Sequence, residues 1–328
     1  MLSVYCLAPT GLKLLERIPE APLPEEAVWL DLLEPTLEEE RLVEQRLGLD
    51  IPTREEMRDI ESSSRLYEEA GALYLTATIV TKLDSTQPEN TQITFILAGQ
   101  RLVTNRYVDP LPMRRFVAYT DRHPQANTSA QAVFAGLLES IVERIADVIE
   151  RVGGDMDNAS AEIFAHRAVP GSKQRRGSQR DFRKVLERIG QCGELIAKAR
   201  ESLASLSRLL AFVQQSPVAM PQDVRNRMRT LSKDVVAMSD HASFLSTNLN
   251  FILDATLGMI NIDQNNILKI FSVVTVFLLP PSVIGAVFGM NFVHIPTLQE
   301  PWGFYGALLL MALSAILPYL WFRKKGWL

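Results

Sequence analysis

The stretch NILKIFSVVTVFLLPPSVIGAVFGMNF, residues 266–292, carries one charged side chain, Lys269, near its start. The rest of it is as long as the ~20 apolar residues with which an α-helix crosses a ~30 Å hydrocarbon core. A second apolar run follows at 302–322, and Glu300 is the only charged residue from 270 to 322. Because a soluble core could hardly bury two such runs side by side, the sequence predicts two transmembrane helices, at about 270–292 and 302–322.

The flanks of the two runs predict their orientation. The second run is followed directly by Arg323, Lys324 and Lys325, and loops rich in Lys and Arg remain on the cytoplasmic side. The first twenty residues lack the basic segment and long apolar core of a signal peptide. We therefore expect both termini in the cytoplasm, the loop 291–301 outside, and a multi-pass protein of a bacterial-type cytoplasmic (inner) membrane.

Composition narrows the function of the polar part of the chain. The 328 residues carry a net charge of −4, which argues against a nucleic-acid partner. Cys6 and Cys192 are the only two cysteines and lie far apart, so we expect no disulfide and no CxxC metal site. The chain has no GxxxxGK[ST], GxGxxG or HExxH motif. We expect no enzyme activity and no resident cofactor, and any transport would follow a gradient or the membrane potential.

Polar and small residues of the first apolar run fall on one face of a helix. The spacing alternates between three and four residues, which keeps the stripe on one side. The stripe, with the positions that extend it toward the N-terminus, comprises Asp254, Gly258, Asn261, Asn265, Leu268, Ser272, Thr275, Leu279, Ser282, Ala286 and Gly289. Lipid cannot satisfy hydroxyl or amide groups, so this face must contact protein or water. One interpretation is close helix packing through Gly285-x-x-x-Gly289. The other is a water-filled pore lined by several copies of the stripe.

The part before the membrane segments predicts an α/β/α domain followed by a helical stalk. We divide the chain into a cytoplasmic α/β domain at 1–127, a cytoplasmic helical stalk at 128–266 and a transmembrane domain at 267–328. Strand-like runs occupy 4–8, 27–33, 72–80, 91–97 and 101–107, and helices are expected at 36–48, 53–63, 128–165 and 179–215. The last stalk helix begins near Pro221 and continues into the first membrane segment, about 70 residues or ~100 Å in all.

These residues together resemble the CorA family of divalent metal-ion transporters. The resemblance rests on Gly289-Met290-Asn291 at the outer end of the penultimate helix, the short loop, the final helix and the basic ending RKKGWL. A lone GMN triplet would be uninformative, whereas GMN between two terminal membrane segments is specific. The fold class implied is an α+β membrane protein, a pentameric funnel with two C-terminal transmembrane helices in each subunit.

The resemblance implies a homopentamer in which five copies of the long helix line one pore. Asn291 would meet the hydrated cation at the outer mouth, Gly289 would allow close passage of the chain, and Met290 would pack. The family's pore-facing positions match Asn265, Leu268, Thr275, Leu279, Ser282 and Ala286, with the two leucines as hydrophobic gates, and Asp254 matches an acidic position at the cytoplasmic mouth. Asn261 and Ser272 join this predicted pore lining because they lie on the same stripe. Arg323, Lys324 and Lys325 match a basic collar. The implied partners are further copies of the chain, the lipid bilayer and divalent metal ions, which could also occupy regulatory sites in the cytoplasmic part.

The outer loop departs from the pattern of magnesium transporters in the family. They usually carry Met-Pro-Glu-Leu, whereas this chain has Ile295-Pro296-Thr297-Leu298, with His294 before it and Glu300 after it. The family's zinc-transporting branch also lacks the loop glutamate, and imidazole suits Zn²⁺ better than Mg²⁺. We expect Zn²⁺ or Mg²⁺ as the transported ion, with a slight preference for Zn²⁺ and with Co²⁺ and Ni²⁺ as further candidates. The alternative is a non-conducting, membrane-anchored metal sensor or interaction protein of the same architecture. The basic connector 166–184 is a further departure from magnesium transporters, which carry acidic helix tips there.

Overall fold

The chain forms two compact units, Met1–Asp254 and Ala255–Leu328. The computed structural model describes residues 1–8, 11–15, 23–59, 61–82, 88–123, 127–164, 182–216, 218, 220–290 and 302–325. One helix, α6, has residues in both units, because it runs from Gln222 to Phe288.

The described part of the first unit contains a seven-stranded mixed sheet in the order β2-β1-β3-β7-β6-β5-β4. Its strands are β1 (Leu2–Ala8), β2 (Gly11–Leu14), β3 (Ala27–Leu33), β4 (Leu66–Glu69), β5 (Ala72–Thr81), β6 (Glu89–Ala98) and β7 (Arg101–Arg106). Neighbouring strands are antiparallel except for β3 and β7, which pair in parallel at the centre. The turn between β6 and β7 is formed at Gly99, whose φ of 57° is a conformation that glycine adopts without strain.

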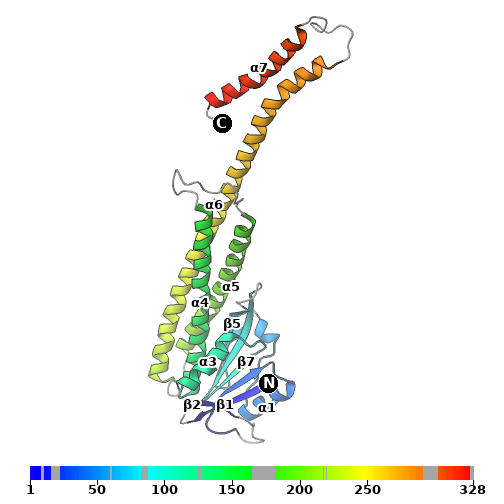
Figure 1. Ribbon diagram of the computed structural model, residues 1–328. Helices are drawn as coiled ribbons and strands as arrows, with labels where there is room; N and C mark the ends of the chain where they lie inside the picture. The colour runs from blue at the N-terminus through cyan, green and yellow to red at the C-terminus, as the bar shows by residue number, and fades with distance from the viewer. Residues whose placement is uncertain are drawn as a thin grey trace. The chain divides into compact units, whose positions relative to one another are not determined.

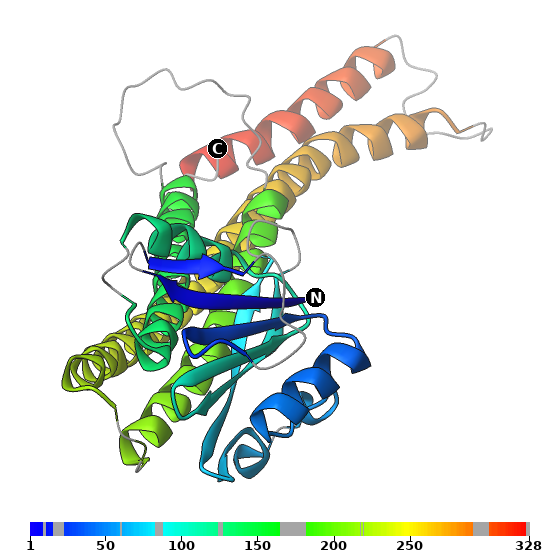
Figure 2. The ribbon, with the colours of Figure 1, turned by 90° about the horizontal axis from the view of Figure 1, so that it is seen from below.

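Helices cover both faces of the sheet, and Figure 2 shows α1 on the side opposite α4 and α5. The helices of the first unit are α1 (Leu37–Leu47), the 3₁₀ turn η1 (Glu56–Arg58), α2 (Ser62–Arg65), α3 (Leu111–Arg122), α4 (Ala130–Phe164), α5 (Phe182–Gln215) and the first part of α6 (Gln222–Phe288). Alternate side chains of the strands supply the two cores. Val43 of α1 packs against Leu30, Leu32 and Val103 on one face, while Phe95 meets Phe134 of α4 on the other.

The sheet carries a buried ion pair on the face toward α3 and α4. Arg106 of β7 donates two hydrogen bonds to the Asp31 carboxylate of β3, from Nε to Oδ1 at 2.9 Å and from Nη2 to Oδ2 at 2.7 Å. Thr104 also donates to Asp31, at 2.6 Å. Burial alone would lower the pKa of the Arg106 guanidinium, but hydrogen bonds and attraction from Asp31 and Asp109 raise that pKa above its usual value. The charge of this buried arginine is therefore balanced within the sheet.

Helix α5 takes the place of a neighbouring strand along part of β5. The short strand β4 pairs with β5 only from Ala72 to Leu75. Beyond it, the backbone N–H of Thr78 donates to Ser205 Oγ at 2.9 Å, and Ser202 Oγ donates to the Thr78 carbonyl at 3.0 Å. These groups are buried, and buried backbone groups need hydrogen-bond partners. Two serines therefore attach the helix to the sheet and cover its edge.

Helices α4, α5 and α6 are the stalk that the sequence predicts, and Figure 1 shows α4 and α5 running side by side. The part of α6 in the first unit buries one apolar face, formed by Val224, Met228, Leu231, Val235, Ala242, Leu245 and Ile252. Arg227 of α6 also holds Glu139 of α4 with two hydrogen bonds, of 2.8 and 2.6 Å. A hydrogen bond to Glu139 is the main reason that the pKa of Arg227 is raised.

One local prediction needs correction, and three elements were missed. The helix expected at 53–63 is only the turn η1 and the short helix α2. Thr53 and Glu56 form reciprocal capping bonds, but the stretch offers little apolar surface besides Met57, so a longer helix has no face to bury. The sequence reading also missed β2 and β4, which are four residues each, and α3, which the prolines at 110 and 112 concealed.

Candidate functional site

The polar stripe of α6 is exposed along its whole length within one chain. Every stripe residue from Asp254 to Gly289 is exposed to solvent in the single chain. The two leucines proposed as gates have exposed fractions of 62% (Leu268) and 58% (Leu279). Half-buried residues of the same membrane segment lie elsewhere around the helix, among them Val273, Pro281 and Ile284. The predicted pore-lining residues therefore share one exposed face within one chain, and most of the other residues from 261 to 279 are exposed as well.

Helix α7 (Gly303–Lys324) contacts a different face of α6. Phe277 meets Tyr319 of α7 edge to face, with ring centroids 6.3 Å apart. Gly285 also lies against α7, because a Cβ added there would come within 3.1 Å of Met311 Cε. At about 100° per residue, Phe277 lies opposite the middle of the stripe, whereas Gly285 lies at the side of the stripe, about 100° from its middle. Close packing through a small residue therefore occurs at Gly285, beside the stripe.

The hydroxyl groups of the stripe donate their protons to their own helix. Ser272 donates to the Leu268 carbonyl at 2.8 Å, Thr275 to Phe271 at 2.8 Å and Ser282 to Leu278 at 2.7 Å. A hydroxyl that donates in this way still has lone pairs with which to accept a hydrogen bond or coordinate a cation. The exposed face of α6 therefore presents oxygen acceptors at three levels, which suits a hydrated divalent cation.

Two consecutive prolines, Pro280 and Pro281, lie within the membrane segment of α6. Proline has no N–H, so the carbonyls of Val276 and Phe277 lose their regular partners four residues later. Both prolines are half-buried, whereas Ser282 next to them is exposed on the stripe. The helix continues through this position to Phe288.

Gly289 and Met290 form a turn directly after α6, which ends earlier than the boundary at 292 that the sequence suggests. The N–H of Gly289 donates to the Gly285 carbonyl at 2.9 Å. A Cβ on Gly289 would lie 3.0 Å from that same oxygen, so a larger residue would need the backbone to shift by a few tenths of an ångström. The Met290 side chain is 47% exposed within one chain. Asn291, His294, Thr297 and Glu300 lie outside the described residues, as does most of the basic connector 166–184.

The proposed basic collar lies at the end of α7. Arg323 and Lys324 form the last turn of the helix and Lys325 is its C-cap, where positive charge is favoured by the helix dipole. Lys325 Nζ lies 4.8 Å from the centre of the Trp321 ring, a cation–π contact that the sequence reading did not identify. The two residues are four positions apart, a spacing that places side chains next to one another on a helix and could have predicted this contact.

The described residues contain no group of three or more His, Cys, Asp or Glu side chains placed to hold a metal ion. Both cysteines are free thiols, as the sequence predicted. Burial raises the pKa of Cys192 to about 11, so this thiol remains protonated at neutral pH.

Comparison with known proteins gives one consistent relationship. The family model of the CorA-like Mg2+ transporter protein matches residues 24–324. A curated relative, the magnesium transport protein CorA of Escherichia coli strain K12, is 31% identical over 329 residues and is covered completely, as is this chain.

Two solved structures share the fold. The complete CorA magnesium transporter of Methanocaldococcus jannaschii aligns with a TM-score of 0.77 and 17% identity, covering 100% of this chain and 99% of that one. The ZntB cytoplasmic domain of Vibrio parahaemolyticus aligns with a TM-score of 0.58 and 8% identity, over 80% of this chain and 98% of that one. The two apolar helices α6 and α7 are long enough to cross a membrane. From the match to the family model and the full-length relative, we conclude that this chain belongs to the CorA family of metal-ion transporters.

Proposed function

We propose that this protein conducts a divalent metal cation across the cytoplasmic membrane, through a homopentameric pore lined by the stripe of α6. The observation that carries the proposal is the separation of faces on α6. The only other described membrane helix, α7, contacts Gly285 and Phe277, while the oxygen-bearing stripe stays exposed, as does most of the helix from 261 to 279; the stripe differs from the other exposed faces in carrying polar groups. A polar face in a membrane needs protein or water, and several copies around a central channel provide both.

The proposed conduction path follows from the order of groups along the helix. Asn291 would accept the hydrated ion at the outer mouth, and the hydroxyls of Ser282, Thr275 and Ser272 would exchange hydrogen bonds with its water shell. Rings of Leu279 and Leu268 would close the path by excluding water. Both termini would lie in the cytoplasm, with Arg323, Lys324 and Lys325 around the inner end. Because α6 also belongs to the first unit, changes in that unit could bias the gate.

The identity of the ion rests on two observations that favour different metals. The full-length curated relative is named a magnesium transport protein. The outer loop, by contrast, has Thr297 instead of an acid and His294 nearby, which favours Zn²⁺. Uptake into liposomes containing the purified protein, followed with Mg²⁺- and Zn²⁺-sensitive dyes in parallel, separates the two. Uptake of neither ion, by a correctly assembled protein, would instead support the non-conducting sensor.

Cysteine accessibility tests which face of α6 lines the pore. We expect Ser282→Cys to react with a charged, water-soluble methanethiosulfonate reagent and to lose most of its cation uptake after reaction, because this position lies on the exposed stripe. Ile284→Cys, two residues away on the half-buried side, should react slowly and keep its uptake. Both variants are compared with and without reagent. Equal blockage at the two positions would contradict the assignment of faces.

A further inference from the structure

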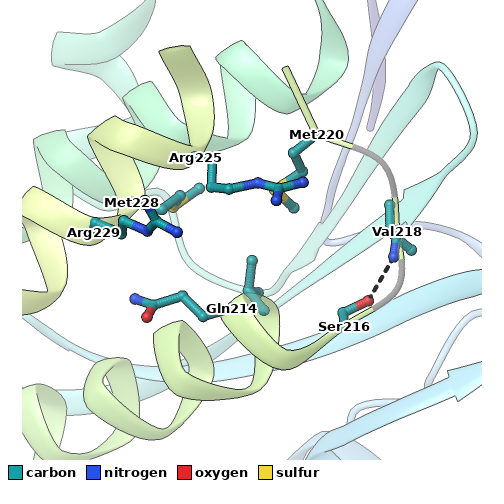
Figure 3. A pocket seen from close by; sticks show the side chains of 8 residues that line it. Gln214, Ser216, Val218, Met220, Arg225, Met228 and Arg229 are labelled. Carbon is teal, nitrogen blue, oxygen red and sulfur yellow. Dashed lines mark hydrogen bonds between the residues drawn. The ribbon is translucent and has the colours of Figure 1, made fainter. Parts of the chain in front are cut away.

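A cavity of about 360 Å³ lies in the first unit, where α5 ends and α6 begins, and it plays no part in the proposed ion path. Its described lining consists of Val213, Gln214, Ser216, Val218, Met220, Arg225, Met228 and Arg229. Figure 3 shows Arg225 and Arg229 extending from α6 toward the same space that Gln214 and Ser216 reach from the end of α5. The volume falls within the range of about 300–1,000 Å³ that is typical of small-molecule sites.

The two guanidinium groups of this cavity are not neutralised by the described protein. Arg225 and Arg229 are both exposed and form no ion pair among the described residues. The acid nearest to Arg225 in sequence, Asp223, acts on Arg227, which is already held by Glu139. Two positive charges thus face one cavity without an ion-pair partner among the residues that the structure describes.

The helix itself is destabilised by this arrangement. Arg225 and Arg229 are four residues apart on α6, and Lys233 continues the same row, so like charges are neighbours along the helix surface. Arg225 also lies in the first turn, where the helix dipole disfavours positive charge. An anion bound between the two arginines would offset both effects. Such a ligand gives a physical reason for placing like charges next to one another on the helix.

Two half-buried side chains, Val218 and Met220, give the cavity its accessible apolar surface. Met228 and Val213 also line it but are almost completely buried. The hydroxyl of Ser216 accepts a hydrogen bond from the Val218 N–H at 3.2 Å, which leaves its own proton available to an acceptor in the cavity. The Gln214 amide offers two further donors. The cavity therefore combines donors and positive charge with a smaller apolar surface.

We propose that this cavity binds a small organic anion, with its phosphate or carboxylate group between Arg225 and Arg229 and a short apolar body against Val218 and Met220. Arginine is suited to this task because its planar group donates two parallel hydrogen bonds to such oxygens. The site is separate from the stripe of α6, so it does not depend on which cation the protein conducts.

The test uses the full-length protein, purified in detergent and freed of divalent metal, with calorimetric titration by inorganic phosphate and by n-butyl phosphate. We expect both to bind and n-butyl phosphate to bind more tightly, because its alkyl chain reaches the apolar surface. Arg225→Gln/Arg229→Gln should weaken binding by at least about tenfold, since two charge-assisted hydrogen-bonded contacts are lost. The matched control is Arg200→Gln, an exposed arginine on α5 away from the cavity, and it should bind as the wild type does.

Thermal melting gives a second and independent readout. Without added anion, the double variant should melt at a higher temperature than the wild type, because the like-charge repulsion is removed. Phosphate should raise the melting temperature of the wild type more than that of the double variant. Equal affinity in the wild type and the double variant, or an equal loss in Arg200→Gln, would overturn the proposal. The absence of phosphate binding to the assembled wild-type protein would overturn the proposal as well. If n-butyl phosphate bound no more tightly than phosphate, the proposed contact between the ligand and the apolar surface of the cavity would be wrong.

Discussion

Asn291→Ala is expected to lower divalent-cation uptake by about ten- to a hundredfold while leaving assembly intact. Each subunit would lose the amide that meets the hydrated ion at the outer mouth, and a hydrogen bond to a charged group is worth about 1.5–3 kcal/mol. The loss should affect entry of the ion and not the fold, because the membrane helix already ends at Phe288. Uptake into proteoliposomes measures the flux, and size-exclusion chromatography of the same preparation measures assembly.

A matched control for this variant is Asn266→Ala, which changes the same residue type on α6 at a position outside the stripe. Asn266→Ala should transport like the wild type. Normal flux through assembled Asn291→Ala would remove Asn291 from the proposed role and favour an entry site formed elsewhere in the loop.

Thr297→Glu, which places an acid in the outer loop, should raise Mg²⁺ uptake relative to Zn²⁺ uptake if that loop contributes to selectivity.

The long helix and its stripe could be predicted because their signals are local and repeated. After Pro221, the next glycine or proline is Gly258, which predicts a long uninterrupted helix. Its polar positions recur every three or four residues, which predicts that they share one face. The structure adds what spacing alone left open. Gly285 lies against Met311 of α7, while the residues of the stripe are exposed within one chain.

Features that depend on distant parts of the chain were not predictable in this way. The attachment of α5 to the edge of β5 joins Ser205 to Thr78 across 127 residues, and serine in a helix carries no signal for such a contact. The anion cavity likewise requires the end of α5 and the start of α6 to meet. Short elements such as β4 are held by their neighbours in the sheet, so their four residues show little pattern of their own.

Arg106→Met is expected to cause the largest loss of stability of any substitution considered. The side chains of Arg106 and Asp31 are only 7% and 5% exposed, and the variant would leave the Asp31 carboxylate buried without its cation. Removing one partner of a buried ion pair typically costs about 3–5 kcal/mol. We expect a marked fall in melting temperature, or a failure to accumulate folded protein, measured by the tryptophan fluorescence of the purified full-length chain during heating. Trp29 donates to Thr104 within the same network, so its emission reports on this region.

The double variant Asp31→Leu/Arg106→Met distinguishes a lost ion pair from a loss of packing. If the damage in Arg106→Met comes from an uncompensated charge, replacing the second partner with an apolar side chain should recover much of the melting temperature, because no buried charge remains. Recovery should be incomplete, since Thr104 also loses its acceptor on Asp31. A double variant less stable than Arg106→Met would contradict this account and would mean that the carboxylate has another structural role, such as holding Thr104 in the orientation that accepts the Trp29 hydrogen bond.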